Sequence, residues 1–182
     1  TLNLKEAQNL TATQFNGISK EAKGSIKTLD LSYIDVTDFE FSEFEALKTL
    51  ELTSFKKMTA AQFNGISKEA KALIKYLNLS EIDVTGFDFS GLTGLKVLNL
   101  SLSEGLTSLP EDIGEFTSLT DLNLMGNRVL TSLPTSITDL SNLCSIDISG
   151  CGISETVRTN LQQAFDVDGY QGPQFVFSME QF

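Results

Sequence analysis

The stretch QFNGISKEAK, residues 14–23, occurs again without change at residues 62–71. The similarity continues at the same offset of 48 residues, where YIDVTDFEFS (33–42) corresponds to EIDVTGFDFS (81–90). Self-similarity at a fixed period is typical of repeat architectures, in which stacked units share one continuous core. The sequence therefore predicts an array of repeats.

A shorter period lies inside this unit. Two apolar residues separated by one other residue recur at steps of 27, 21, 27, 21, 24 and 24 residues. A mean step of 24 is typical of leucine-rich repeats, which predicts an α/β solenoid of about seven repeats. Its parallel strands should form a curved sheet on the concave face, with helices and loops on the convex face. The pairs are Leu2/Leu4, Leu29/Leu31, Leu50/Leu52, Leu77/Leu79, Leu98/Leu100, Leu122/Leu124 and Ile146/Ile148.

The long return segments, such as LTATQFNGISKEAKGSIK (10–27), are predicted to be helical. Thr-x-x-Gln at residues 11–14 and 59–62 has the spacing of a capping box. Glycines at positions 17 and 65 are predicted points of interruption. Four apolar residues of the first long segment share one helical face and are expected to face the core: Phe15, Ile18, Ala22 and Ile26.

The shorter return segments predict other structure. FEFSEFEAL (39–47) and FDFSGLTGL (87–95) are too short for a full helix, and their phenylalanines are expected to fill the core. Pro110 and Pro134 predict an extended bend in the last two returns. Asn127 and Cys151 stand at the corner position where such repeats often have Asn or Cys, so Cys151 is predicted to be buried. The earlier repeats carry Ile34, Phe55, Ile82 and Ser103 there.

Composition excludes several functions. The chain has no histidine and two cysteines, which excludes Ser-His-Asp and Cys-His catalysis and nearly all zinc sites. A net charge of −11 argues against a nucleic-acid partner, and no apolar run is long enough to predict a membrane span. We expect no enzyme activity in these residues, no cofactor and no metal.

Two short patterns in the sequence give weak signals of a chemical site. DVDG (166–169) begins like a calcium loop, but the glutamate that should close the loop falls on Phe177. Cys144 lies near Asp147, but no histidine can activate the thiol. Neither signal predicts a site.

The residues between the paired leucines should point away from the core. They are Asn3, Asp30, Glu51, Asn78, Asn99, Asn123 and Asp147. One interpretation is a solvated face whose Asn ladder supports neighbouring strands, and the other is a surface that docks a protein partner with a basic surface. The partner-binding residues predicted for this concave face are Tyr33, Glu51, Tyr76, Asn78, Asn99, Asp121, Asn123 and Asp147.

The C-terminal part departs from the repeat, and we predict a solenoid at 1–153 followed by a capping helix and linker at 154–182. A helix starting at Ser154 or Glu155 would place Val157, Leu161 and Phe165 on one face and cover the open end of the solenoid. The segment GYQGPQFVFSM (169–179) has no leucine spacing. Its Gly-Pro pair at 172–173 predicts a turn, and Phe175 and Phe177 alternate as in a short strand that pairs with or covers the last repeat.

Two segments here resemble the end of the repeats in bacterial secreted effectors of the IpaH/SspH type, which are novel E3 ubiquitin ligases. They are GCGISETVRTNL (150–161) and YQGPQFVFSM (170–179), in matching order and spacing. The resemblance implies a protein-interaction module that recognises the substrate of a ligase domain beyond Phe182. It also implies secretion into the host cytoplasm, a host protein as partner, a role in virulence, and a contact between the repeats and that ligase domain.

The chain departs from this family in two ways. The family usually repeats about every 20 residues, whereas TSLP occurs only twice here and the 27-residue steps are foreign to it. The family's catalytic cysteine lies in a Cys-x-Asp motif, which is absent from this chain. The alternative is a stand-alone scaffold or adhesion protein without ligase activity.

Overall fold

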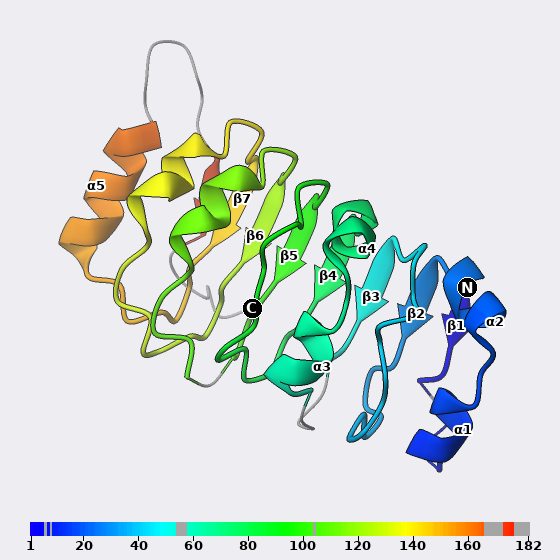
Figure 1. Ribbon diagram of the computed structural model, residues 1–182. Helices are drawn as coiled ribbons and strands as arrows, with labels where there is room; N and C mark the ends of the chain where they lie inside the picture. The colour runs from blue at the N-terminus through cyan, green and yellow to red at the C-terminus, as the bar shows by residue number, and fades with distance from the viewer. Residues whose placement is uncertain (6, 8, 54–57, 104, 166–172, 177–182) are drawn as a thin grey trace.

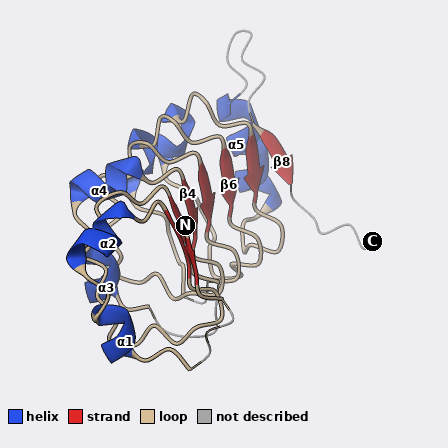
Figure 2. Ribbon diagram, turned by 90° about the vertical axis from the view of Figure 1, so that its right-hand side faces the viewer, coloured by secondary structure: helices blue, strands red, loops and turns tan. Residues whose placement is uncertain are grey.

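The computed structural model describes residues 1–182 except 6, 8, 54–57, 104, 166–172 and 177–182. Its strands form one parallel sheet in chain order (Figure 1). Figure 2 shows the helices on one side of the chain and the sheet on the other. The eight strands are β1 (Leu2–Asn3), β2 (Thr28–Asp30), β3 (Thr49–Glu51), β4 (Tyr76–Asn78), β5 (Val97–Asn99), β6 (Asp121–Asn123), β7 (Ser145–Asp147) and β8 (Gln174–Val176).

The predicted apolar pairs set the register of this sheet. The first residue of each pair is aligned with its equivalent in the next strand, as Leu29 is with Leu50 and Leu50 with Leu77. The second residue, such as Leu31, follows the strand and is also fully buried. Because a single repeat cannot cover both side chains, the core is continuous across the array. The predicted solenoid is confirmed, with β8 as one strand more than the pairs indicated.

Helices occupy the two long return segments, and each segment is interrupted at its predicted glycine. They are α1 (Ala12–Asn16), α2 (Lys20–Ser25), α3 (Ala60–Asn64) and α4 (Lys68–Leu73). Both predicted capping boxes form, from Thr11 with Gln14 and from Thr59 with Gln62. Gly17 and Gly65 are the C-caps of α1 and α3, and a new N-cap serine starts the following helix.

This break makes one predicted core position wrong. Phe15 is buried and Ile18 and Ile26 are half-buried against the core, but Ala22 is exposed. Helix α2 starts afresh after Ser19, so the helical phase of α1 does not continue into it. Lys23 takes the inward position instead, and it is 0% exposed.

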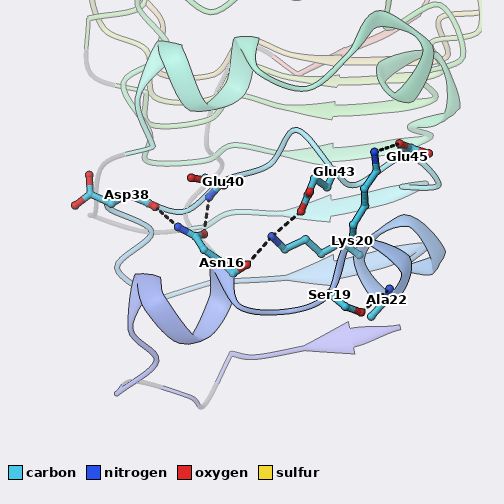
Figure 3. Close-up of polar contacts among 9 residues, drawn as sticks. Asn16, Ser19, Lys20, Ala22, Asp38, Glu40, Glu43 and Glu45 are labelled. Carbon is cyan, nitrogen blue, oxygen red and sulfur yellow. Dashed lines mark hydrogen bonds and ion pairs between the residues drawn. The ribbon is translucent and has the colours of Figure 1, made fainter.

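The buried ammonium of Lys23 has two partners, Asn16 and Glu43, which Figure 3 labels. Its Nζ donates to the backbone carbonyl of Asn16 at 3.2 Å and to Oε2 of Glu43 at 3.1 Å. Lys71, its equivalent in the second long segment, donates to the carbonyl of Asp88 and lies 4.7 Å from the centre of the Phe63 ring. Burial lowers the pKa of Lys71, an effect opposed by the charge of Asp88 and reinforced by that of Lys68.

The shorter returns fill the core with aromatic rings, as predicted. Phe39 stacks on Phe15 with ring centres 4.2 Å apart, and Phe87 stacks on Phe63 at 4.7 Å. In the last two returns, Pro110 and Pro134 have extended backbone and precede two 3-10 helices, η1 (Glu111–Glu115) and η2 (Thr135–Asp139).

The type of residue at the corner after each strand changes along the array. Asn127 is buried, and its Nδ2 donates to the carbonyls of Leu100 at 2.8 Å and Leu124 at 2.7 Å. Cys151 is buried as predicted. Ile34 and Ile82 pack into the core, whereas the equivalent Phe55 lies outside the described residues.

The C-terminal helix α5 (Glu155–Phe165) forms where predicted. Leu161 and Phe165 are buried and Val157 packs against the core. The helix lies in the return segment between β7 and β8, so β8 occupies the last place in the sheet. Phe175 of β8 is in register with Ile146, which confirms the predicted short strand, while Phe177 lies outside the described residues. The domain boundary at residue 153 stays a prediction.

Candidate protein-binding face

The outward side chains of the strands form the candidate site. In β2 to β7 they come from the first and third residues of the strand, on either side of a buried middle residue. We call the sheet surface that carries them the open face, which lies away from the helices (Figure 2). The register aligns five of the predicted partner-binding residues in one row, with Asp30 before them: Glu51, Asn78, Asn99, Asn123 and Asp147.

The Asn and Asp residues of this row stabilise the turns that follow the strands. In each of them Oδ1 accepts the backbone N–H two residues later, as Asn78 does from Ser80 at 3.1 Å. The same bond is made by Asn3, Asp30, Asn99, Asn123 and Asp147. This local turn satisfies a backbone donor at the end of the strand. Four predicted partner-binding residues therefore have a structural role: Asn78, Asn99, Asn123 and Asp147.

The two predicted tyrosines are not neighbours. Tyr76 is aligned through Thr49 with Thr28, five residues before Tyr33. Tyr76 therefore starts its strand, whereas Tyr33 lies beyond the C-terminal end of β2, in the turn that follows it. Tyr33 is 52% exposed, and the ammonium of Lys5 lies 5.5 Å from the centre of its ring. Tyr76 is 49% exposed and is the anchor that the open face itself presents.

The charge of the open face is negative. Among the outward positions of the described strands, four are carboxylates and none is Lys or Arg. The four are Asp30, Glu51, Asp121 and Asp147. Asp121 is exposed in the row that also contains Tyr76, because Tyr76 is aligned with Val97 and Val97 with Asp121. A face of one sign attracts a partner of the opposite sign over several ångströms.

Beside the strands lies a row of residues of which Tyr33 alone was among the predicted partner-binding residues. Four residues after the first apolar residue of a strand, the backbone enters the left-handed region, at Tyr33, Glu81, Leu102, Gly126 and Gly150. Leu102 has a φ of 56°, and 45% of its side chain is exposed. It lies over Gly126, where a Cβ atom would meet its side chain. The signal in the sequence is the pair of glycines at this position in the last repeats.

Cysteine and acidic side chains are the potential metal ligands of the described residues. No group of three Cys, Asp or Glu side chains within them could hold a metal ion. Cys144 is exposed and precedes β7, whereas Cys151 is buried with its Sγ 3.0 Å from the carbonyl oxygen of Leu124. Burial raises the pKa of the Cys151 thiol. Within the same residues, no helix is long and apolar enough to cross a membrane.

Comparison with known proteins identifies no family for this chain. No family model and no curated protein matches the chain. Thirty-three chains of solved structures are similar to it. Among them is a leucine-rich repeat protein of Leptospira interrogans, at 20% identity and a TM-score of 0.48, with 90% of this chain and 58% of that chain covered. The chain thus spans just over half the length of that protein. Its own repeat and strand register make this chain a leucine-rich repeat solenoid.

Proposed function

We propose that the chain is a protein-binding module whose open face docks a partner with a basic surface. The observation that carries the proposal is the set of four carboxylates, without a cation, at the outward positions of the described strands. Glu51 and Asp121 are the residues best placed to meet basic side chains. Neither accepts the N–H two residues later in the described structure, and Asp121 accepts only the hydroxyl of Thr120, at 2.7 Å. Tyr76 adds an exposed aromatic contact between them.

The finer proposal is that this module selects the substrate of a bacterial effector E3 ubiquitin ligase, secreted into a host cell. Its support is the resemblance of residues 150–161 and 170–179 to the segments that follow the repeats in that family. The ligase activity, and any contact between the repeats and the ligase domain, would belong to residues beyond Phe182. The reading frame after Phe182 tests this directly, since a Cys-x-Asp motif in a helical region is required.

A stand-alone scaffold or adhesion protein is the second candidate. The observation that favours it is β8, which engages Gln174–Val176 of the second resembling segment in the sheet. That part of the tail thus has a structural use that needs no following domain. A stop codon within a few residues of Phe182 would support the scaffold and exclude the ligase.

The docking proposal is tested with a variant pair of equal charge. Glu51→Lys with Asp121→Lys reverses two carboxylates on the open face, and Glu21→Lys with Glu111→Lys reverses two exposed carboxylates elsewhere. A dye-labelled oligolysine peptide should bind the wild type and the control pair alike at low salt, and the open-face pair at least tenfold more weakly. Equally weakened peptide binding in both variant pairs would show that net charge alone causes the effect, and it would refute the site.

A further inference from the structure

We propose that a column of four lysines, directly before the strands β2 to β5, binds an acidic segment of a protein partner. The lysine column consists of Lys27, Lys48, Lys75 and Lys96, each of which directly precedes one of the strands β2 to β5. The proposal does not rest on the basic partner proposed above. The carboxylates invoked there occupy other positions on the strands, and the ligand here has the opposite charge.

Hydrogen bonds between repeats hold the column in register. The N–H of Lys48 donates to the carbonyl of Lys27 at 2.7 Å, that of Lys75 to Lys48 at 2.7 Å, and that of Lys96 to Lys75 at 2.9 Å. Each of these carbonyls also accepts the N–H of the residue after the next lysine. Because adjacent strands lie about 4.8 Å apart, the four backbone positions span about 14 Å. The fold therefore presents these lysines at fixed intervals.

The ammonium groups of the column have no carboxylate partner within the described residues. Lys27, Lys48 and Lys96 are exposed, and Lys75 is half-buried with its Nζ close to Gly94. The ion pairs of the described chain involve other cations, namely Lys20 with Glu45, Lys23 with Glu43 and Arg158 with Glu155. In a chain with 24 acidic and 13 basic residues, the column is a local reversal of charge. Like charges on neighbouring strands repel, and a bound anion relieves that repulsion.

The neighbouring row favours a peptide over other anions. One residue after each lysine, the outward side chains of Thr28, Thr49, Tyr76 and Val97 form an aligned row that is uncharged up to its next member, Asp121 of β6. Hydroxyl, aromatic and aliphatic groups can contact the backbone and apolar side chains of a peptide, whereas a free phosphate would engage only the lysines.

The geometry also fixes the kind of peptide. An extended chain advances about 3.3 Å per residue, so a segment of about five residues covers the column. Its side chains on one face recur every second residue, which places about three carboxylates against the four ammonium groups. An aromatic or aliphatic side chain on the same segment would contact Tyr76. The expected ligand is thus a short acidic stretch of protein that contains an apolar residue.

A matched set of variants tests this. The probe is a dye-labelled seven-residue peptide with a central phenylalanine and glutamate elsewhere, and binding is followed by fluorescence anisotropy at low salt. Lys48→Gln with Lys96→Gln removes two exposed charges of the column, and Lys20→Gln with Lys68→Gln removes two exposed charges from α2 and α4. We expect at least a tenfold loss of affinity for the column pair and less than a twofold change for the control pair.

A variant that gains affinity completes the test. Thr120 continues the column, since its N–H donates to the carbonyl of Lys96 at 2.8 Å. Thr120→Lys should therefore tighten peptide binding several-fold, whereas Thr131→Lys, an exposed position with the same added charge, should not. Equal losses in both glutamine pairs, or equal gains in both lysine variants, would show an effect of net charge alone and overturn the proposal. Tight binding of tripolyphosphate without binding of the peptide would also overturn it.

Discussion

Lys23 and Lys71 occupy the same position in two consecutive 48-residue units, but only Lys23 has a carboxylate within bonding distance of its ammonium. The residue that corresponds to Glu43 in the second unit is Gly91. Lys71 donates to the carbonyl of Asp88 instead. Both ammonium groups thus have a backbone carbonyl and an aromatic ring, and within the described residues Lys23 has the carboxylate of Glu43 in addition.

Replacing these two lysines by methionine should have unequal effects on stability. Lys23→Met leaves the carboxylate of Glu43 and the carbonyl of Asn16 without this donor, and we expect a loss of about 2 kcal/mol. Lys71→Met removes a poorly compensated buried charge, so its effect should stay within about 1 kcal/mol. Urea unfolding of both variants measures the difference. A larger loss in Lys71→Met than in Lys23→Met would contradict this account.

The stability of the protein should depend on Lys71 at alkaline pH. Burial lowers the pKa of Lys71 below its ordinary value of 10.5, so between the lowered pKa and 10.5 the unfolded chain binds the proton that the folded chain has lost. The contribution of Lys71 to the free energy of unfolding therefore rises with pH in that window. The difference between wild type and Lys71→Met, measured by urea unfolding at several alkaline pH values, should increase accordingly. A difference that is constant or falls would refute the lowered pKa.

The two capping boxes should differ in strength. Gln14 and Gln62 both accept the N-cap N–H, but Nε2 of Gln62 also donates to the carbonyls of Val36 at 2.7 Å and Phe39 at 2.9 Å. Gln14→Ala should cost about 1 kcal/mol, and Gln62→Ala about 2 kcal/mol, because it removes two further hydrogen bonds and leaves the carbonyl of Val36 with the N–H of Phe39 as its donor. Thermal unfolding of the two variants decides the order, and equal losses would assign no stability to the additional bonds.

The contact of Leu102 with Gly126 predicts a double-mutant cycle. Gly126 has a φ of 79°, and a Cβ there would meet the Leu102 side chain. Gly126→Ala should cost about 2 kcal/mol through backbone strain and this clash together. In the background of Leu102→Ala the clash is relieved, so the same substitution should cost about 1 kcal/mol. The coupling energy from chemical unfolding of the four proteins measures the contact.

Sequence periodicity was sufficient for the fold because its signal is repeated in every unit. The buried leucine pairs, the capping boxes and the phenylalanines of the shorter returns all depend on local spacing, and the structure has them in the expected places. The inward turn of Lys23 was missed because a break of a few residues resets the helical phase. The spacing of apolar residues along the sequence does not show at which residue the helical phase starts again.

The open face was predicted less well. Alternation along a strand identifies Asn78 as outward, but it does not reveal that Oδ1 of Asn78 accepts the N–H of Ser80. Likewise, Tyr33 and Tyr76 look equivalent in the sequence, and only the structure shows that Tyr76 starts its strand whereas Tyr33 lies in the turn after β2. Which atoms remain available for a partner depends on hydrogen bonds that composition and periodicity do not encode.

The contacts between return segments determine how such an array can change its length. Asn16 bonds to the backbone of Asp38 and Glu40, and Asn64 bonds in the same way to Gly86 and Asp88, so each long return is tied to the short return that follows it. Loss of one return alone would leave the amide of its neighbour without partners. Addition or removal of a whole 48-residue pair would therefore leave each remaining amide of this kind with both of its backbone partners.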